Sequence, residues 1–353
     1  MLGLACTAVS TFAAESDLAS VRLDRLQGVF DRSAGLAPLS RDVVLTRLPA
    51  LAPSESFPVP PPEGGFGRTT LNAAAVGLRE VTYQNRNGYA VFEGDMVLGD
   101  VTEAASHQLD SDFTISRSYN QPFAQFYWID TSVWYDGSIP FCFQNGFSET
   151  QQQLILAQIA IFNAAVGDVV KFQPDGTGAD RLVCPGGDLS SRSRVRIAPW
   201  TQAEVCQAQV GRIVGKEQWV WLHPSCDARN ILHELSHAAG MLHEHTRSDR
   251  DQWVTVQWDN IPHDEWADFS QTHPLPTENI GQYDFLSIMH YRLSEFAIAN
   301  GRPTLVVKAG VTAPPVSQIG TRDELSPLDI AGLKAKYIRA HQLSALHPLL
   351  PDQ

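Results

Sequence analysis

The sequence predicts an α+β fold, and two kinds of local pattern indicate it. A capping-box pattern at Ser148–Gln151 opens an amphipathic helix over residues 149–165. Short apolar runs at 195–197 and 219–222 are typical of strands instead. The chain has no internal repeat, and irregular stretches separate its few regular elements. With 43% hydrophobic and 18% charged residues, most of the chain has enough apolar surface to build a core.

Residues 1–14 are apolar (MLGLACTAVSTFAA) and precede the polar Glu15-Ser16-Asp17. This arrangement resembles the apolar region and small-residue cleavage site of a secretory signal, although no basic segment precedes it. A disordered tail or an N-terminal core segment is the alternative. Removal of this segment would take Cys6 with it and leave four of the five cysteines, an even number that suits an oxidising, extracytoplasmic environment.

The part of the chain that follows divides into segments of different composition. An amphipathic helix is expected around 18–30. Residues 52–65 (APSESFPVPPPEGG) contain five prolines, which favour an extended chain, so this stretch is predicted to be a linker. Between 66 and 117 the hydrophobic periodicity is weak, and turns are indicated at Asn87-Gly88 and Gly94-Asp95.

The remaining elements are predicted from apolar runs and helix signals. Aromatic and apolar residues crowd 123–143, where a turn at Asp136-Gly137 indicates short strands. A helix is expected over 227–239, and a last helix over 327–337.

Charge excludes two classes of partner. The formal net charge is −13. Residues 1–117 carry 14 acids against 9 bases, and 118–353 carry 25 against 17, so both parts are acidic. Neither part offers the basic footprint that nucleic acid or an anionic membrane surface requires. No apolar run reaches the roughly 20 residues that span a bilayer.

The strongest chemical signal is the run HELSHAAGMLHEH at 233–245. On a helix, His233 and His237 project from one face and can share a metal ion. Glu234 points beside that face and can act on water without being a ligand. Gly240 permits the helix to end in a left-handed turn, after which the chain can deliver His243 as a third ligand. Three nitrogen ligands with one open position are typical of catalytic zinc, and a helix with surface histidines is the alternative.

This motif, HExxHxxGxxH, resembles the zinc-binding motif of the metzincins, and Ser287–Tyr291 fits their Met-turn. The run 244–251 (EHTRSDRD) is similar to the astacin family. The resemblance covers about 134–337 and includes Val210-Gly211-Arg212, Ile319-Gly320 and Leu325-Ser326. It implies a twisted, mostly antiparallel-edged sheet with the zinc helix in an upper subdomain. An irregular lower subdomain would carry the C-terminal helix. The catalytic domain is expected at 119–338, and a tail at 339–353.

The resemblance implies a role for each residue of the site. One Zn²⁺ would be bound by three histidines: His233, His237 and His243. Glu234 would be the general base that takes a proton from the attacking water. Tyr291 would be a switchable fifth ligand that swings out to stabilise the oxyanion; a tyrosine that only packs in the core is the alternative.

Four neighbouring residues are expected to be structural. Met289 would form the floor of the metal site. Glu244 would be linked, directly or through water, to the new N-terminus of the mature enzyme. His245 and His290 are expected to pack or to form hydrogen bonds rather than to bind metal.

Astacins are typically made as zymogens whose prosegment carries an FxGD motif, and Phe92-Glu93-Gly94-Asp95 fits it. The resemblance implies that Asp95 occupies the open metal position in the latent form; a turn in which Asp95 caps local amides is the alternative. Residues 15–118 would then be the propeptide. Activating cleavage is expected between Ser116 and Gln125, where Arg117 offers a trypsin-like site.

Four cysteines allow three pairings. The resemblance implies a disulfide between Cys206 and Cys226, just before the zinc helix. The second bridge of astacins uses a cysteine near the end of the catalytic domain, and no cysteine follows Cys226 here. The pairing of Cys142 with Cys184 is therefore left open.

Together these features predict a secreted zinc endopeptidase that is made as a latent zymogen and is cleaved to its active form by an activating protease. We expect a monomer whose peptide or protein substrate pairs with an edge strand around 194–199. Family members often favour an acidic side chain just after the cleaved bond, but no basic residue of this sequence is assigned to that pocket.

Three other functions share some of these features. A matrixin-like metzincin is disfavoured by Glu244 and by the absence of a cysteine-switch motif upstream. A metal-dependent amidase or deacetylase would not require the Met-turn. A catalytically silent zinc-binding module would have no use for Glu234 beside an open position.

Overall fold

A computed structural model describes residues 62–73, 77–105, 133–134, 136–186, 193–213, 216–271, 279–299 and 301–346. The expected signal at 1–14, the helix around 18–30, the prolines up to 61 and the activation region lie outside these residues. Within them, no helix combines the length and the hydrophobicity needed to cross a membrane.

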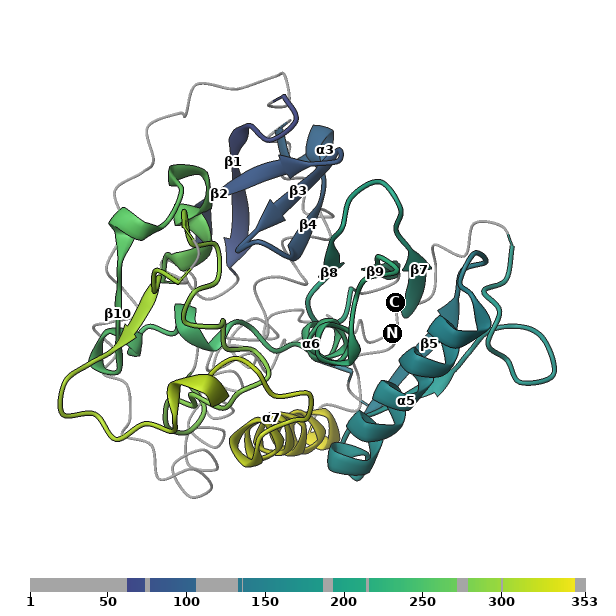
Figure 1. Ribbon diagram of the computed structural model, residues 1–353. Coiled ribbons are helices and arrows are strands. Elements are labelled where there is room, and N and C mark those ends of the chain that lie inside the picture. The colour runs from purple at the N-terminus through teal and green to yellow at the C-terminus, as the bar shows by residue number, and fades with distance from the viewer. Residues whose placement is uncertain are drawn as a thin grey trace, which may run out of the picture. The chain divides into compact units, whose positions relative to one another are not determined.

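The N-terminal described segment forms an antiparallel sheet, coloured purple to blue in Figure 1. Its elements are β1 (Phe66–Ala73), β2 (Gly77–Arg86), β3 (Tyr89–Phe92), β4 (Met96–Asp100) and the short helix α3 (Val101–Ala105). The predicted turn at Asn87-Gly88 joins β2 to β3, with φ of 55° and 82°, as expected for a two-residue hairpin loop. This small sheet has a buried core of its own, formed by Val81, Tyr83, Ala90, Leu98, Val101 and Ala104.

The sequence did not predict these strands, and β4 shows why. Leu98 packs in the core of the small sheet, whereas Val97 packs on the other side against Trp200 and Trp221. A strand that is buried on both faces shows no alternation of apolar and polar residues.

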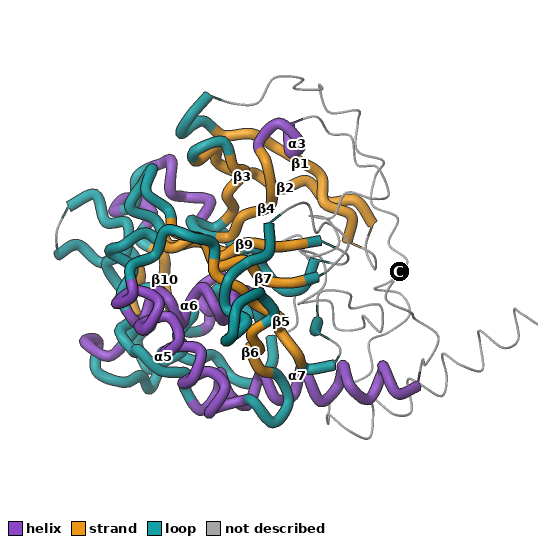
Figure 2. The backbone as a smooth tube through the Cα atoms, turned by 90° about the vertical axis from the view of Figure 1, so that its right-hand side faces the viewer, coloured by secondary structure: helices purple, strands orange, loops and turns teal. Residues whose placement is uncertain are grey.

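The second half of the sheet belongs to the predicted catalytic domain (Figure 2). It contains β5 (Ser138–Phe143), β6 (Lys171–Pro174), β7 (Arg194–Pro199), β8 (Cys206–Ala208) and β9 (Glu217–Leu222). The order is β4-β8-β9-β7-β5-β6, and within the catalytic part only β8 runs antiparallel to its neighbour. The expectation that 194–199 is an edge strand was wrong, because β7 pairs with β9 on one side and with β5 on the other. Instead β8 forms the edge, and strand β4 of the N-terminal segment (residues 62–105) covers it through the pair Met96–Ala208.

Three helices pack with this sheet. The helix α5 (Glu149–Val166) has the predicted capping box, in which Ser148 and Gln151 hydrogen-bond reciprocally. The helix α6 (Ala228–Ala238) begins at the N-cap Asp227, whose side chain accepts a hydrogen bond from the Asn230 amide. The helix α7 (Pro327–Leu346) begins where it was predicted and continues beyond residue 337. The shared core includes Ile139, Phe141, Ile155, Phe162, Val195, Ile197, Leu232, Leu235, Leu333 and Tyr337.

Between α6 and α7 the described chain is mostly irregular, as the α+β prediction implied. It has one two-stranded sheet, β10 (Val254–Val256) with β11 (Leu305–Val307). The 3-10 helices are η1 (Glu244–Thr246), η2 (Arg250–Gln252), η3 (Trp258–Asn260), η4 (His263–Phe269) and η5 (Val316–Gln318).

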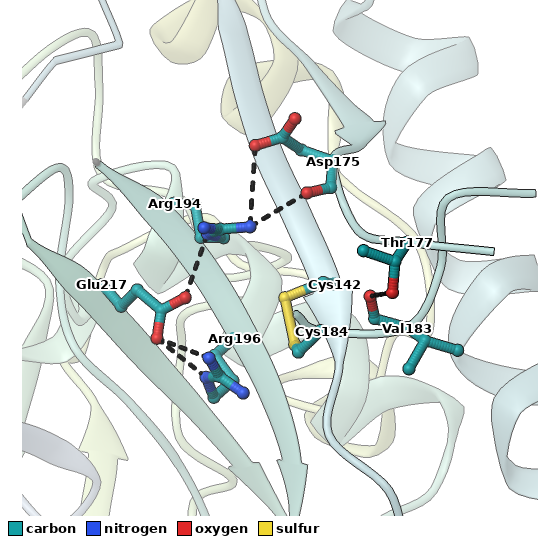
Figure 3. Close-up of a disulfide and its surroundings, with 8 residues drawn as sticks. All are labelled: Cys142, Asp175, Thr177, Val183, Cys184, Arg194, Arg196 and Glu217. Carbon is teal, nitrogen blue, oxygen red and sulfur yellow. Dashed lines mark hydrogen bonds and ion pairs between the residues drawn. A yellow bond between two sulfur atoms is a disulfide. The ribbon is translucent and has the colours of Figure 1, made fainter. Parts of the chain in front are cut away.

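The four described cysteines form two disulfides. The disulfide Cys206–Cys226, implied by the resemblance, joins β8 to the residue before the N-cap of α6. The disulfide Cys142–Cys184, left open by the sequence, joins β5 to the loop after β6 (Figure 3).

A buried cation lies close to the second disulfide. Figure 3 shows the guanidinium of Arg194 between Asp175 and Glu217, and its Nε lies 3.0 Å from Glu217 Oε1. Glu217 also binds Arg196 at 2.7 Å, so charged groups are paired where β7 and β9 run side by side.

We expect the two disulfides to contribute differently to the metal centre. Replacing both Cys206 and Cys226 by alanine should lower the free energy of unfolding by about 3 kcal/mol in the chain-entropy model. It should also weaken zinc binding, because it frees the start of α6. The matched pair Cys142→Ala/Cys184→Ala should cost about 4 kcal/mol for its longer loop but leave zinc affinity nearly unchanged. Denaturant unfolding and zinc titration measure both; equal losses of affinity would contradict the assignment.

Candidate metal centre

Two of the three motif histidines lie on one face of α6. His233 and His237 are four residues apart, both are buried, and their ring centroids lie 4.7 Å apart. The helix ends at the C-cap Ala239, and Gly240 has a φ of 94°, in the left-handed region. The chain reverses there and places the ring of His243 within 4.9 Å of His237.

A hydrogen bond on the Nδ1 atom fixes the direction of each ring. The Nδ1 of His233 lies 2.9 Å from the carbonyl of Ile288, and that of His237 lies 2.8 Å from the carbonyl of Met241. A carbonyl oxygen only accepts, so both Nδ1 atoms carry the hydrogen and the Nε2 lone pairs face inward. The Nδ1 of His243 faces the carboxylate of Glu93 at 3.2 Å. Such partners are typical of metal-binding histidines.

The carboxylate of Asp95 lies among the three Nε2 atoms. Its oxygens are 3.2 Å from His233, 3.5 Å from His237 and 3.2 Å from His243. The Nε2 atoms of His233 and His243 are themselves 3.2 Å apart. Ligands at about 2.0–2.1 Å from a tetrahedral zinc ion would be separated by about 3.3–3.4 Å. These four side chains therefore form a site that could hold one zinc ion.

Buried atoms without partners support the same conclusion. The cluster and the neighbouring Glu234 contribute three buried polar atoms that lack a hydrogen-bond partner among the described residues: His237 Nε2, Asp95 Oδ1 and Glu234 Oε2. Leaving such an atom unsatisfied costs about 1–3 kcal/mol. A cation held between the histidines and Asp95 would satisfy the first two, so the donor set fits zinc.

The pKa values reflect burial opposed by charge. Burial lowers the pKa of His233 to about 4 and lowers that of His237 as well. Burial would also lower the pKa of His243, but the carboxylates of Asp95 and Glu93 raise it to about 10. Burial, and then the charge of Asp95, raise the pKa of Glu234 well above its usual value. The carboxylates of Asp95 and Glu93 thus place negative charge beside the imidazoles, where a bound cation would offset it.

The predicted Met-turn lies against helix α6, which carries His233 and His237. Met289 is fully buried, and its carbonyl accepts a hydrogen bond from the Glu244 amide at 3.1 Å. Asp329 on α7, which the sequence analysis missed, accepts hydrogen bonds from the Ser287 hydroxyl at 2.6 Å and the Ile288 amide at 2.9 Å. Ser326 and Asp329 hydrogen-bond reciprocally at the start of α7, a capping-box spacing that could have revealed Asp329.

Tyr291 faces the N-terminal segment in this structure. Its hydroxyl donates a hydrogen bond to the carbonyl of Glu93 at 3.1 Å, and its ring stacks on His245 at 3.7 Å. The Nε2 of His245 lies 3.0 Å from the carbonyl of Asp268. His290 lies 2.8 Å from the Tyr283 hydroxyl. Neither of these two histidines belongs to the cluster that could hold the metal.

Glu244 is enclosed by polar partners. Its carboxylate accepts a hydrogen bond from the Asp284 amide at 2.7 Å and lies 3.3 Å from Arg247. Burial raises the pKa of Glu244 to about 8.

The N-terminal segment reaches the centre through the turn between β3 and β4. Glu93, which the sequence analysis missed as a functional residue, is fully buried and accepts a hydrogen bond from the Thr246 hydroxyl at 3.1 Å. Glu93 and Gly94 have φ of 48° and 83°. These left-handed conformations turn the carboxylates of Glu93 and Asp95 toward the histidines. No local pattern marks Glu93, because its partners lie about 150 residues further along the chain.

Tyr89 on β3 provides a second contact between the N-terminal segment and the predicted catalytic domain. Its ring centroid lies 4.9 Å from that of Trp221 and 5.8 Å from that of Trp200. Val91 and Val97 join the same buried cluster. The N-terminal segment is therefore held by apolar packing as well as by Glu93 and Asp95 at its tip.

Comparison with known proteins agrees with this geometry. The sequence model of the Astacin family of peptidases matches residues 129–338, and the chain belongs to this family. The zinc metalloproteinase dpy-31 of Caenorhabditis elegans is 38% identical over 144 residues, 40% of this chain and 24% of that protein. The zinc metalloproteinase nas-6 of the same organism is 39% identical over 135 residues, 37% of this chain and 38% of that protein. The chain thus spans well under half the length of these relatives.

Among solved structures, the chain resembles high choriolytic enzyme 1, a hatching enzyme zinc-protease from Oryzias latipes (Medaka fish). The TM-score is 0.49 at 27% sequence identity, over 61% of this chain and 98% of that one. Membership of the astacin family confirms the predicted α+β metzincin fold and sets the matrixin alternative aside.

We expect the chain to bind one zinc ion through the histidine cluster. His243→Ala should lower zinc affinity by at least about tenfold and remove most of the thermal stabilisation that zinc confers. The partly exposed His223 provides a matched control, since His223→Ala removes an imidazole outside the cluster. Zinc titration with a competing chelator and thermal unfolding measure both effects. Unchanged affinity in His243→Ala would contradict the site.

Proposed function

We propose that this chain is a zinc-dependent endopeptidase made as a latent precursor. One observation carries the proposal: Asp95, from a segment far from the motif in the sequence, lies among the Nε2 atoms of three histidines. Zinc would be held by His233, His237 and His243. When bound, it would polarise the scissile carbonyl and lower the pKa of the attacking water to about 7. The names of the curated relatives, zinc metalloproteinases, support this activity.

Glu234 would act as the general base. It directly follows His233, is buried on the metal helix, and has an oxygen without a hydrogen-bond partner among the described residues. Burial raises the pKa of its carboxyl group, which makes the carboxylate a stronger base. Glu234 can therefore take a proton from the attacking water and later pass it to the leaving amine.

Tyr291 would stabilise the oxyanion that develops on the scissile carbonyl. In the latent form its hydroxyl donates to the carbonyl of Glu93. Departure of the prosegment would free this donor for the substrate, and a donor aimed at developing charge is worth several kcal/mol. Met289, buried beneath the histidines, would keep the floor of the site fixed.

Latency would have two components. Asp95 occupies the position that water and the scissile carbonyl require. In addition, the Ala208 amide on β8 donates to the carbonyl of Asp95 at 3.1 Å, so the prosegment covers the edge on which an extended peptide would pair. We therefore assign residues 15–118 to the propeptide, 119–338 to the catalytic domain and 339–353 to a tail.

Activation would require a cut between Ser116 and Gln125 by another protease. The resulting N-terminal amine would approach Glu244, whose buried carboxyl group has a pKa raised to about 8 and would gain from a nearby cation. Two disulfides support a secreted protein, with residues 1–14 as its signal, because such bonds persist in oxidising compartments. We propose that the mature enzyme acts as a monomer on peptide or protein substrates.

The proposal is tested by nicking the purified chain with trypsin and assaying casein cleavage. Chelator-sensitive cleavage that zinc restores is the expected result. Glu234→Gln should lower kcat by at least about a hundredfold while one zinc per chain stays bound. Zinc binding without any cleavage in the nicked wild type would instead favour a silent zinc-binding module.

We also predict that Asp95 maintains latency. The uncut Asp95→Ala chain should cleave a short fluorogenic peptide at a rate at least about tenfold above the uncut wild type, because the carboxylate no longer fills the metal position. Asp100→Ala, an exposed change at the end of β4, is the matched control and should stay latent. If uncut Asp95→Ala remains as inactive as wild type, the switch is wrong.

A further inference from the structure

An acidic pair borders the metal centre. Glu265 and Asp268 lie on η4, in the irregular part of the chain. A Cβ atom added at Gly94 would lie 3.0 Å from Asp268 Oδ2 and 2.8 Å from the Tyr291 hydroxyl oxygen. Gly94 directly precedes Asp95, which occupies the metal position. The acidic pair is therefore next to the place where a residue adjoining the scissile bond would lie.

In the latent form, this pair holds an arginine from the prosegment. The Nη2 of Arg86 lies 2.9 Å from Glu265 Oε2 and 3.6 Å from Asp268 Oδ2. Its Nη1 donates to the carbonyl of Gly94 at 2.7 Å. One guanidinium thus contacts both carboxylates and a main-chain carbonyl of the segment that fills the centre.

Nothing else in the described chain neutralises the pair. Among the described residues, Arg86 is the only cation that forms an ion pair with either Glu265 or Asp268. Asp268 is 5% exposed, and its Oδ2 is buried without a hydrogen-bond partner among those residues. Burial, followed by the neighbouring Glu265, raises the pKa of Asp268 well above its usual value. Departure of the prosegment would remove Arg86 and leave two adjacent carboxyl groups without their cation.

We propose that Glu265 and Asp268 form a subsite for a cationic substrate side chain, so that the active enzyme prefers arginine, and to a lesser degree lysine, beside the bond it cleaves. This inference rests on the proposed peptidase function. Arg86 occupies the subsite in the latent form as a substrate side chain would in the active form. Arginine is favoured because its planar fork of donors can reach both carboxylates and a main-chain carbonyl together, whereas an ammonium acts as a point charge.

The test compares peptides that differ at one position. Fluorogenic peptides carry arginine, lysine, citrulline or glutamate on either side of the scissile bond, and citrulline matches the shape of arginine without its charge. For the activated wild type, kcat/KM should be at least about tenfold higher with arginine than with citrulline at one of these positions. Equal rates, or a preference for glutamate at both positions, would overturn the subsite.

Variants assign the preference to the pair. In Glu265→Gln and in Asp268→Asn the ratio between the kcat/KM values for the arginine and citrulline peptides should fall toward one. Asp264→Asn, which removes an exposed charge from the same 3-10 helix, should keep the wild-type ratio. If Asp268→Asn does not fold, the half-buried Glu265 still provides the test. A wild-type ratio in Glu265→Gln would overturn the assignment.

Binding separates this inference from the proposed function. Activated Glu234→Gln protein should bind the arginine peptide at least about tenfold more tightly than the citrulline peptide in a fluorescence anisotropy titration. A wild type that cleaves no peptide would contradict the peptidase function alone, since the affinity ratio would still report the subsite. Chelator-sensitive cleavage with no discrimination in rate or affinity would contradict the subsite alone.

Discussion

The centre depends on one constraint: three imidazole Nε2 atoms must point at the same buried position. Each ring is held by a hydrogen bond on its other nitrogen, and the acceptors come from three separate segments: the Met-turn, the loop after Gly240 and the prosegment. A buried ring without such a bond could rotate or change tautomer. The Met-turn and the loop after Gly240 therefore orient His233 and His237 from within the catalytic part, and Glu93 orients His243 in this structure. The chain around α6 must therefore take a path that brings a hydrogen-bond partner to each ring.

The N-terminal segment, which we propose to be the prosegment, meets the catalytic part through three kinds of interaction. Its tip brings the carboxylates of Asp95 and Glu93 to the histidines, Tyr89 packs on two tryptophans, and Arg86 pairs with the acids of η4. The pair between β4 and β8 also continues the sheet from one part into the other. In the proposed activation, release of the prosegment would break polar, apolar and main-chain contacts together. It would also expose the metal position, the sheet edge and the acidic pair, which are the features that we propose a substrate uses.

Local patterns predicted the regular elements that carry strong signals. The capping box at Ser148, the motif on α6 and the start of α7 all lie where the sequence placed them. The strands of the prosegment were not predicted, because β4 is buried on both faces and lacks alternation. The assignment of 194–199 as an edge also failed, since the order of strands in a sheet depends on pairing between distant segments.

The sequence by itself determined the family, through its resemblance to the astacins, and zinc as the cation. It also named five candidate ligands: the spacing of the motif indicated His233, His237 and His243, and the resemblance indicated Asp95 and Tyr291. Only the tertiary structure showed Glu93 behind His243, Asp329 behind the Met-turn, the disulfide Cys142–Cys184, and Arg86 between the acids of η4. Each of these contacts joins residues that are far apart in the chain. Their partners are selected by packing and by the neutralisation of buried charge, and neither leaves a periodic or local pattern in the sequence.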